Sequence, residues 1–195
     1  LPITRLADHF EDIMGSAYSV SLFTNWQSDY IQEIWVKAKE GNDYKPLPDL
    51  FGAKAATVNL HPIPELSAEN CTEQMGVSGP WFERLPHFKM GFTPSSGDEL
   101  QSEFFIPRRN AVEAIMAISR IGDQLGPYLH TSEIRAVDAD DFWMSPCYQQ
   151  DSVAIHFTWK SDGLAGTNAL ALVEKELAPF NPRPHWGKIF TTTHQ

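Results

Sequence analysis

Basic residues and cysteines are both scarce in this 195-residue sequence. The formal net charge is -10 at pH 7, whereas nucleic-acid binding normally depends on a concentrated basic patch that neutralises phosphates. We therefore expect no nucleic-acid partner. Cys71 and Cys147 show neither the density of a secreted disulfide scaffold nor the spacing of a zinc site, so reduced thiols are expected. Whether the two cysteines meet in space is left open by the sequence.

Long apolar runs and nucleotide-binding motifs are also missing. No window approaches the roughly 18 to 20 apolar residues that span a bilayer, and residues 1–5 do not resemble a signal peptide, so we expect a cytoplasmic protein. There is no glycine-rich phosphate loop, so any nucleotide cofactor must be held by something else. The seven histidines show no metal-ligand spacing, which argues against a metal. His9 is interpreted as helix packing, and His61, His87 and His130 as loop or cap residues.

The residues that are present predict one α+β domain with a substantial core, since 42% are hydrophobic and 12% aromatic. Periodicity predicts the following elements: a helix over 4–15 capped by Thr4, a hairpin of strands 18–23 and 31–37 with its turn at 25–29, an irregular stretch over 41–91, a strand over 99–106, a helix over 107–123, strands over 132–137 and 152–160, and a helix over 167–177. Helices between strand pairs indicate a mainly antiparallel sheet covered on one face, with ferredoxin-like layering.

Alternation along the predicted strands separates an apolar face from a polar one. In the strand over 152–160, residues 153, 155, 157 and 159 are apolar, whereas the opposite side carries His156 and Thr158. The same rule places Glu133 with Arg135, and Gln101 with Glu103. If these strands are neighbours, Gln101, Glu133, Arg135 and Thr158 form a surface able to bind hydroxyl groups.

An ordinary solvated sheet face would explain this pattern equally well. Against that reading, Glu133 and Arg135 lie two residues apart between residues that look buried, and buried charged pairs are frequent at functional sites. Residues 182–188 are a second unusual segment, because a lysine, a tryptophan and a glycine follow two prolines. They indicate either a rigid turn with a packed tryptophan or a lysine delivered to a fixed point.

Six tracts of the sequence resemble the alditol oxidases and aldonolactone oxidases, which are FAD enzymes of the vanillyl-alcohol-oxidase type. They are residues 18–24, 69–74, 95–103, 132–135, 156–160 and 185–188. The resemblance implies that residues 1–195 are a substrate-binding cap domain. It also implies that the family's N-terminal FAD-binding domain, usually joined to flavin through a covalent histidine bond, and its C-terminal tail lie outside this chain.

The resemblance further implies a reaction and a set of site residues. A terminal hydroxyl of a polyol such as xylitol or sorbitol would be oxidised by hydride transfer to flavin, and O2 would be reduced to H2O2. Glu133 would accept the proton of the reacting hydroxyl and Arg135 would orient Glu133. The remaining implied contacts are Gln101, Thr158 and Lys188 for the substrate, and His185 and Lys188 for the flavin.

Two alternatives stay open at this point. An aldonolactone oxidase shares the Glu-x-Arg and His-Trp-Gly-Lys elements, although the tract over 95–103 favours an alditol oxidase. A non-catalytic module that binds a sugar or a protein belongs to a different class, and an upstream FAD-binding domain in the open reading frame would argue against it. We also expect that this chain alone is inactive and self-associates through surface that a flavin domain would cover.

Overall fold

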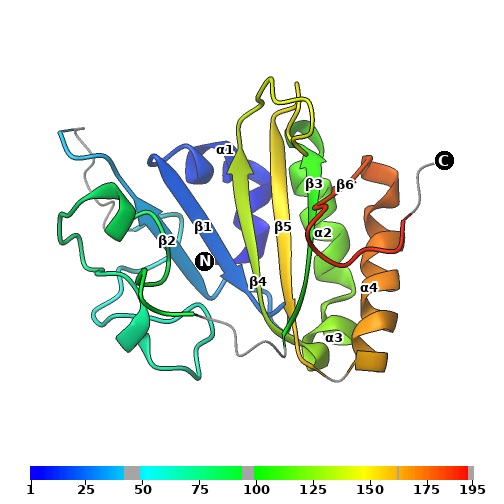
Figure 1. The fold of residues 1–195 in the computed structure, drawn as a ribbon, viewed down its shortest axis with the longest axis horizontal. Helices are drawn as coiled ribbons and strands as arrows, with labels where there is room; N and C mark the ends of the chain where they lie inside the picture. The colour runs from blue at the N-terminus through cyan, green and yellow to red at the C-terminus, as the bar shows by residue number, and fades with distance from the viewer. Residues whose placement is uncertain (42–48, 94–98, 162, 193–195) are drawn as a thin grey trace.

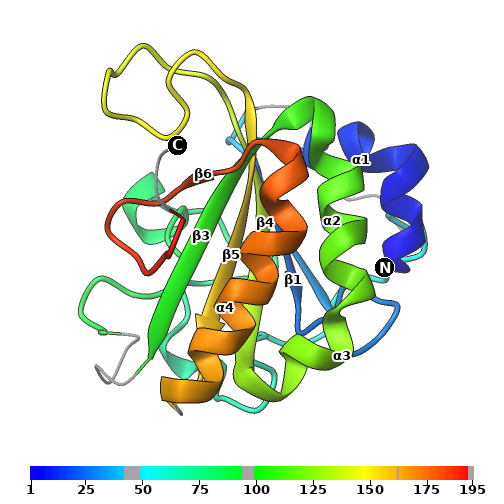
Figure 2. The same cartoon turned by 90° about the vertical axis from the view of Figure 1, so that its right-hand side faces the viewer.

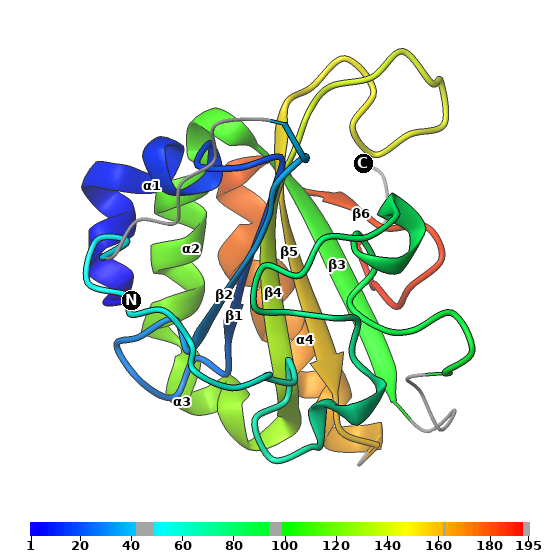
Figure 3. The same ribbon diagram turned by 90° about the vertical axis from the view of Figure 1, so that its left-hand side faces the viewer.

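The computed structural model describes residues 1–41, 49–93, 99–161 and 163–192. It shows an antiparallel sheet with helices on one face and the irregular segment 49–93 on the other (Figures 1 and 3). Six strands are found in these residues, in the spatial order β2-β1-β4-β5-β3-β6. Their bounds are Ser19–Thr24 (β1), Glu33–Lys37 (β2), Leu100–Pro107 (β3), Leu129–Val137 (β4), Ser152–Trp159 (β5) and Arg183–Pro184 (β6). The predicted α+β class is therefore confirmed.

The order of the central strands follows from the chain's β-α-β-β-α-β path. β3 and β4 both pair antiparallel with β5, so they run parallel to each other with β5 between them. With β6 on the outer edge of β3, this is the ferredoxin-like arrangement that the sequence predicts. The predicted hairpin of β1 and β2 is also confirmed, and it extends the sheet beyond β4.

Three helices cover the apolar face of the sheet: α1 (Leu6–Met14), α2 (Ala111–Arg120) and α4 (Gly163–Leu177) (Figure 2). The expected Thr4 cap is wrong, because Thr4 lies inside a 3-10 turn, Ile3–Arg5, that precedes α1. The helix predicted over 107–123 is broken. It begins as a 3-10 turn and ends at Arg120, and a short helix, α3 (Gly122–Leu125), follows. Gly122 permits the close approach of Trp26, whose carbonyl oxygen would lie 2.0 Å from an added Cβ.

The core lies between these helices and the apolar sides of the strands. Phe157 and Trp159 are completely buried, and their rings stack with centroids 5.3 Å apart. The indole nitrogen of Trp159 donates to Ser102 Oγ at 2.9 Å, which satisfies its only polar group. On α4, Leu170, Val173 and Leu177 are buried along one side.

A β-bulge interrupts the pairing of β4 with β5. Leu129 pairs with Trp159, but Thr131 pairs with the next residue, Thr158, so His130 has no opposite residue. The extra residue reverses the side to which the strand points. Leu129 is consequently buried in the core under the helices, although Thr131, two residues later, shares the opposite face with Glu133.

The segment 49–93 has little regular structure, as its sequence predicts. Its described elements are two 3-10 turns, Ala68–Asn70 and Trp81–Glu83, and two isolated bridges, which join Leu50 to Ala53 and Cys71 to Phe88. Cys71 and Cys147 are both free and buried in separate clusters, so they form no disulfide. No helix in the described ranges is long and apolar enough to cross a membrane.

Candidate active site

The strand register assembles the polar residues into rows across three neighbouring strands. Glu133 of β4 lies opposite His156 of β5, which lies opposite Glu103 of β3. In the next row Gln101 lies opposite Thr158. The prediction that these strands are neighbours is confirmed, so Gln101, Glu133, Arg135 and Thr158 do share one face.

Arg135 lies between the two carboxylates and binds Glu103 more closely than Glu133. Its Nη2 is 2.5 Å from Glu103 Oε1, whereas its Nε is 3.7 Å from Glu133 Oε2. The sequence-based interpretation, in which Arg135 chiefly fixes Glu133, identified the longer of these contacts. Arg135 Nε is buried and has no hydrogen-bond partner within the described residues. This N–H group could therefore donate a hydrogen bond to an oxygen atom of a bound molecule.

The C-terminal segment brings Lys188 to the same group, with Lys188 Nζ 2.7 Å from Glu103 Oε2. Backbone hydrogen bonds place it, since His185 N donates to Glu103 O and Ile189 N to Gln101 O, both at 2.9 Å. His185 Nδ1 accepts from Gly187 N at 3.0 Å. Lys188 N donates to His185 O at 3.1 Å and closes the expected turn, but Trp186 is 62% exposed, so the expectation of a packed tryptophan is wrong.

Both carboxylates are held in their ionised form. Burial alone would raise the pKa of Glu133, but a hydrogen bond from His87 and the charge of Arg135 outweigh burial and bring its pKa to about 2. The pKa of Glu103 is also lowered, because Arg135 and Lys188 outweigh its burial. Glu133, Glu103 and Arg135 therefore stay charged at neutral pH, since the pKa of Arg135 is raised by the two carboxylates despite its burial.

His156 occupies the middle of the row and is uncharged at neutral pH. Burial, and then the positive charge of Lys188, lower its pKa to about 4, although the two carboxylates act in the opposite direction. Its Nε2 lies 3.3 Å from Gln101 Oε1. A neutral imidazole can both donate and accept, which suits a surface that binds hydroxyl groups.

The set of site residues predicted from the sequence leaves out three contributors: Glu103, His156 and His87. Alternation placed Glu103 and His156 on the polar face but did not indicate that they belong to the site. His87 lies in the irregular segment, as expected, but its Nε2 contacts Glu133 Oε1 at 2.9 Å. No pattern in the sequence near His87 predicts its contact with Glu133. Among the described residues, no group of three or more His, Cys, Asp or Glu side chains could hold a metal ion.

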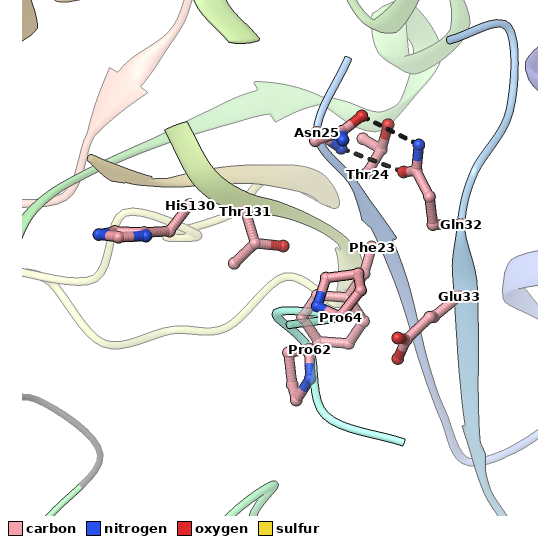
Figure 4. Close-up of a pocket in the computed structure, with 9 residues that line it drawn as sticks. All are labelled: Phe23, Thr24, Asn25, Gln32, Glu33, Pro62, Pro64, His130 and Thr131. Carbon is pink, nitrogen blue, oxygen red and sulfur yellow. Dashed lines mark hydrogen bonds between the residues drawn. The ribbon is translucent and has the colours of Figure 1, made fainter. Parts of the chain in front are cut away.

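A small cavity lies beside this face, where β1 and β2 meet Pro62, Pro64 and Thr131 (Figure 4). Its volume is about 10 Å³, which suits a single water and excludes a polyol. Reciprocal hydrogen bonds between Asn25 and Gln32, of 3.1 and 3.0 Å, hold the predicted turn beside it. This cavity is therefore too small to be the substrate site.

Comparison with known proteins shows the family to which the chain belongs. Residues 97–195, which include all of β3 to β6, match the family model described as D-arabinono-1,4-lactone oxidase. The chain belongs to this family. It is also 49% identical over 193 residues to an alditol oxidase from Streptomyces sp. (strain IKD472 / FERM P-14339). The match covers 99% of the chain but only 45% of that relative. The resemblance drawn from the six tracts is thus confirmed for the family.

Proposed function

We propose that the intact protein is an FAD-dependent oxidase that oxidises the terminal hydroxyl of a polyol such as xylitol or sorbitol, with O2 as the electron acceptor. The observation that carries the proposal is the 49% identity to an alditol oxidase along almost the whole chain. The polar face agrees with it, because a polyol needs many convergent donors and acceptors to replace its water. A non-catalytic binding module does not require the cluster of buried charges around Arg135.

The residues present on this face are suited to contact the edge of a flavin ring that lies beside the substrate. The unpartnered Arg135 Nε and the ammonium of Lys188 are donors that suit the negative charge a flavin gains on reduction. We assign His185 and Lys188 to contact the flavin. When bound, FAD would supply the oxidising power for removal of a hydride from the CH–OH carbon, and O2 would be the final acceptor of two electrons and two protons, giving H2O2.

The roles of this chain's own side chains follow from their charges. Glu133 accepts a hydrogen bond from the reacting hydroxyl and receives its proton as the C–H bond breaks. With a pKa of about 2, Glu133 is a weak base, so Arg135 and Lys188 must lower the energy of the developing alkoxide. Gln101 and Thr158 bind hydroxyls further along the polyol. Glu103 holds both cations in place without needing to contact substrate.

A lactone is the second candidate substrate, because the matching family model carries the name of a lactone oxidase. Steady-state assays of the intact protein with xylitol, sorbitol and a five-carbon aldonolactone discriminate the two. We expect higher kcat/KM with a polyol. A clear preference for the lactone would refute the alditol assignment and retain the oxidase.

Most of the cofactor is proposed to be bound by a separate domain outside these 195 residues, through a covalent histidine bond. The chain spans less than half the length of the alditol oxidase it matches, which supports this division. Mass spectrometry of the intact protein after denaturation tests it, since covalent FAD stays attached to a histidine-containing peptide. Release of all the flavin would contradict the covalent link.

A further inference from the structure

We infer that His87, supplied by the irregular segment 49–93, is a positioning residue that holds the carboxylate of Glu133 in its working orientation. The inference rests on the proposed oxidase function and deepens it. It assigns this segment a place in the active site, beyond that of a cover over the sheet. The contact between His87 Nε2 and Glu133 Oε1, at 2.9 Å, joins residues 46 positions apart in the sequence.

The backbone around His87 is fixed before its side chain is considered. Thr72 N donates to His87 O at 3.0 Å, and Thr72 Oγ1 donates to Pro86 O at 2.7 Å. The bridge between Cys71 and Phe88 continues the same pairing. Two stretches of the irregular segment, residues 71–72 and 86–88, are therefore hydrogen-bonded to each other, which limits the movement of the histidine.

The imidazole is seated against aromatic rings of the sheet. Its centroid lies 5.4 Å from that of Phe23 on β1 and 5.1 Å from that of Trp35 on β2, both edge to face. Such geometry is favourable for aromatic pairs and restricts the ring to a narrow range of orientations. The two ring nitrogens consequently face different partners, with Nε2 toward Glu133 and Nδ1 toward Lys37.

The two partners select one tautomer of His87. Ionised Glu133 can only accept, so Nε2 must carry a hydrogen. The ammonium of Lys37, 3.2 Å from Nδ1, can only donate, so Nδ1 must be bare. Lys37 also donates to the carbonyl of Leu85, which keeps it beside the ring. His87 therefore donates to Glu133 through Nε2, in the way that partners of ring nitrogens commonly fix a histidine.

Both oxygens of Glu133 then have a partner from the chain itself. His87 holds Oε1 with a hydrogen bond, whereas the guanidinium of Arg135 lies 3.7 Å from Oε2 and attracts it by charge without a hydrogen bond. The hydrogen bond from His87 therefore sets the orientation of the carboxylate, and misplacement by about 1 Å can cost about 100-fold in rate. His87 acts through Glu133 and need not contact the substrate.

The test compares three variants of the intact, flavin-loaded protein: His87→Ala, His87→Gln and the control His61→Ala. His61 belongs to the same segment and packs on Phe88, but within the part of the chain that the structure describes its side chain bonds only to Ile63. Stopped-flow flavin reduction by xylitol measures the limiting rate and the apparent Kd separately.

We expect His87→Ala to lower the limiting rate about 10- to 100-fold with little change in Kd. His87→Gln, whose amide can still donate to Glu133, should recover most of that loss, and His61→Ala should react like the wild type.

A second measurement does not depend on activity. The nitrogen NMR shifts of the His87 ring in the intact protein should show the Nε2–H tautomer, and the Nε2–H signal should move when Glu133 is replaced by alanine. An Nδ1–H tautomer that ignores Glu133 overturns the inference, as does equal slowing in His87→Ala and His61→Ala without recovery in His87→Gln. If no polyol or lactone reduces the wild-type flavin, the proposed function fails, and the NMR result alone decides whether His87 holds Glu133.

Discussion

The two faces of the sheet are made by alternate residues of the same strands, yet different forces hold them. Under the helices, Phe157 and Trp159 are fully buried among apolar neighbours. On the other face, buried Glu133 and Glu103 are held by His87, Arg135 and Lys188. Burial of apolar area stabilises the first face, whereas on the second the desolvation of charges offsets much of the gain from pairing them. Substitutions on the two faces should therefore separate stability from activity.

The largest effect is expected from removing the charges of the polar face. In the intact enzyme, Glu133→Gln and Arg135→Ala should slow flavin reduction by about 100- to 10,000-fold, the range for removing a proton acceptor or a preorganised donor. Circular dichroism should still show a folded protein. Near-normal reduction rates in both variants, followed by stopped flow, would refute the assigned roles.

Neighbouring residues of β5 provide a matched pair for the comparison. Phe157→Ala should lower the free energy of unfolding by about 3–5 kcal/mol, because it leaves a cavity in the core. Thr158→Ala, on the opposite face, should cost less than about 1 kcal/mol but raise KM for the polyol about two- to tenfold through a lost hydrogen bond. Urea unfolding and steady-state kinetics check the two values. If Thr158→Ala proved as destabilising as Phe157→Ala, the division between the faces would fail.

Glu103 should influence both properties. Glu103→Gln leaves Arg135 and Lys188 without their shared negative charge, so we expect a loss of about 1–3 kcal/mol in stability and weaker polyol binding. Glu174→Gln is a control, since Glu174 is equally buried but accepts from Thr191 and Thr192 instead. Glu174→Gln should lower the free energy of unfolding without a comparable change in the KM for the polyol, measured from initial rates.

The neutral state of His156 predicts a dependence of stability on pH. Its pKa is about 4 in the folded protein and about 6.5 when unfolded, so between these values the unfolded chain binds a proton that the folded chain does not. Stability from this group is complete above about pH 6.5 and falls toward pH 4, by up to about 1.4 kcal/mol per pH unit. Urea unfolding between about pH 5 and 6.5 should show a shallower slope in His156→Gln. Equal slopes would mean that His156 is protonated when folded.

The smallest effect on stability is expected at an exposed apolar tip beyond both faces. Phe142 and Trp143 are 76% and 83% exposed in the connection between β4 and β5. Replacing both by serine should change stability by less than about 0.5 kcal/mol. By light scattering, it should reduce the predicted self-association of this 195-residue chain. Met90→Ser, at a residue 79% exposed in the segment 49–93, serves as the control.

Sequence reasoning succeeded where the deciding property is local. Alternation along β5 assigned Phe157 and Thr158 to the correct faces, because successive strand side chains point to opposite sides whatever the strand pairs with. It could not show that Glu103 binds Arg135 and Lys188, which lie 32 and 85 residues away. It missed the contact of His87 for a related reason, since the segment 49–93 has no periodicity from which its path can be inferred. The tracts that resemble known oxidases supplied the chemical meaning of the polar face.

The bulge at His130 constrains how this strand can change in evolution. A shift of register by one residue turns every side chain of a strand to the opposite face. Loss of His130 would therefore require either Leu129 to leave the core or Thr131, Glu133 and Arg135 to move beneath the helices. Individual side chains of β4 can be exchanged one at a time to adjust what the face binds. Its length cannot be shortened by one residue without inverting part of the strand, so insertions and deletions should be confined to the loops on either side.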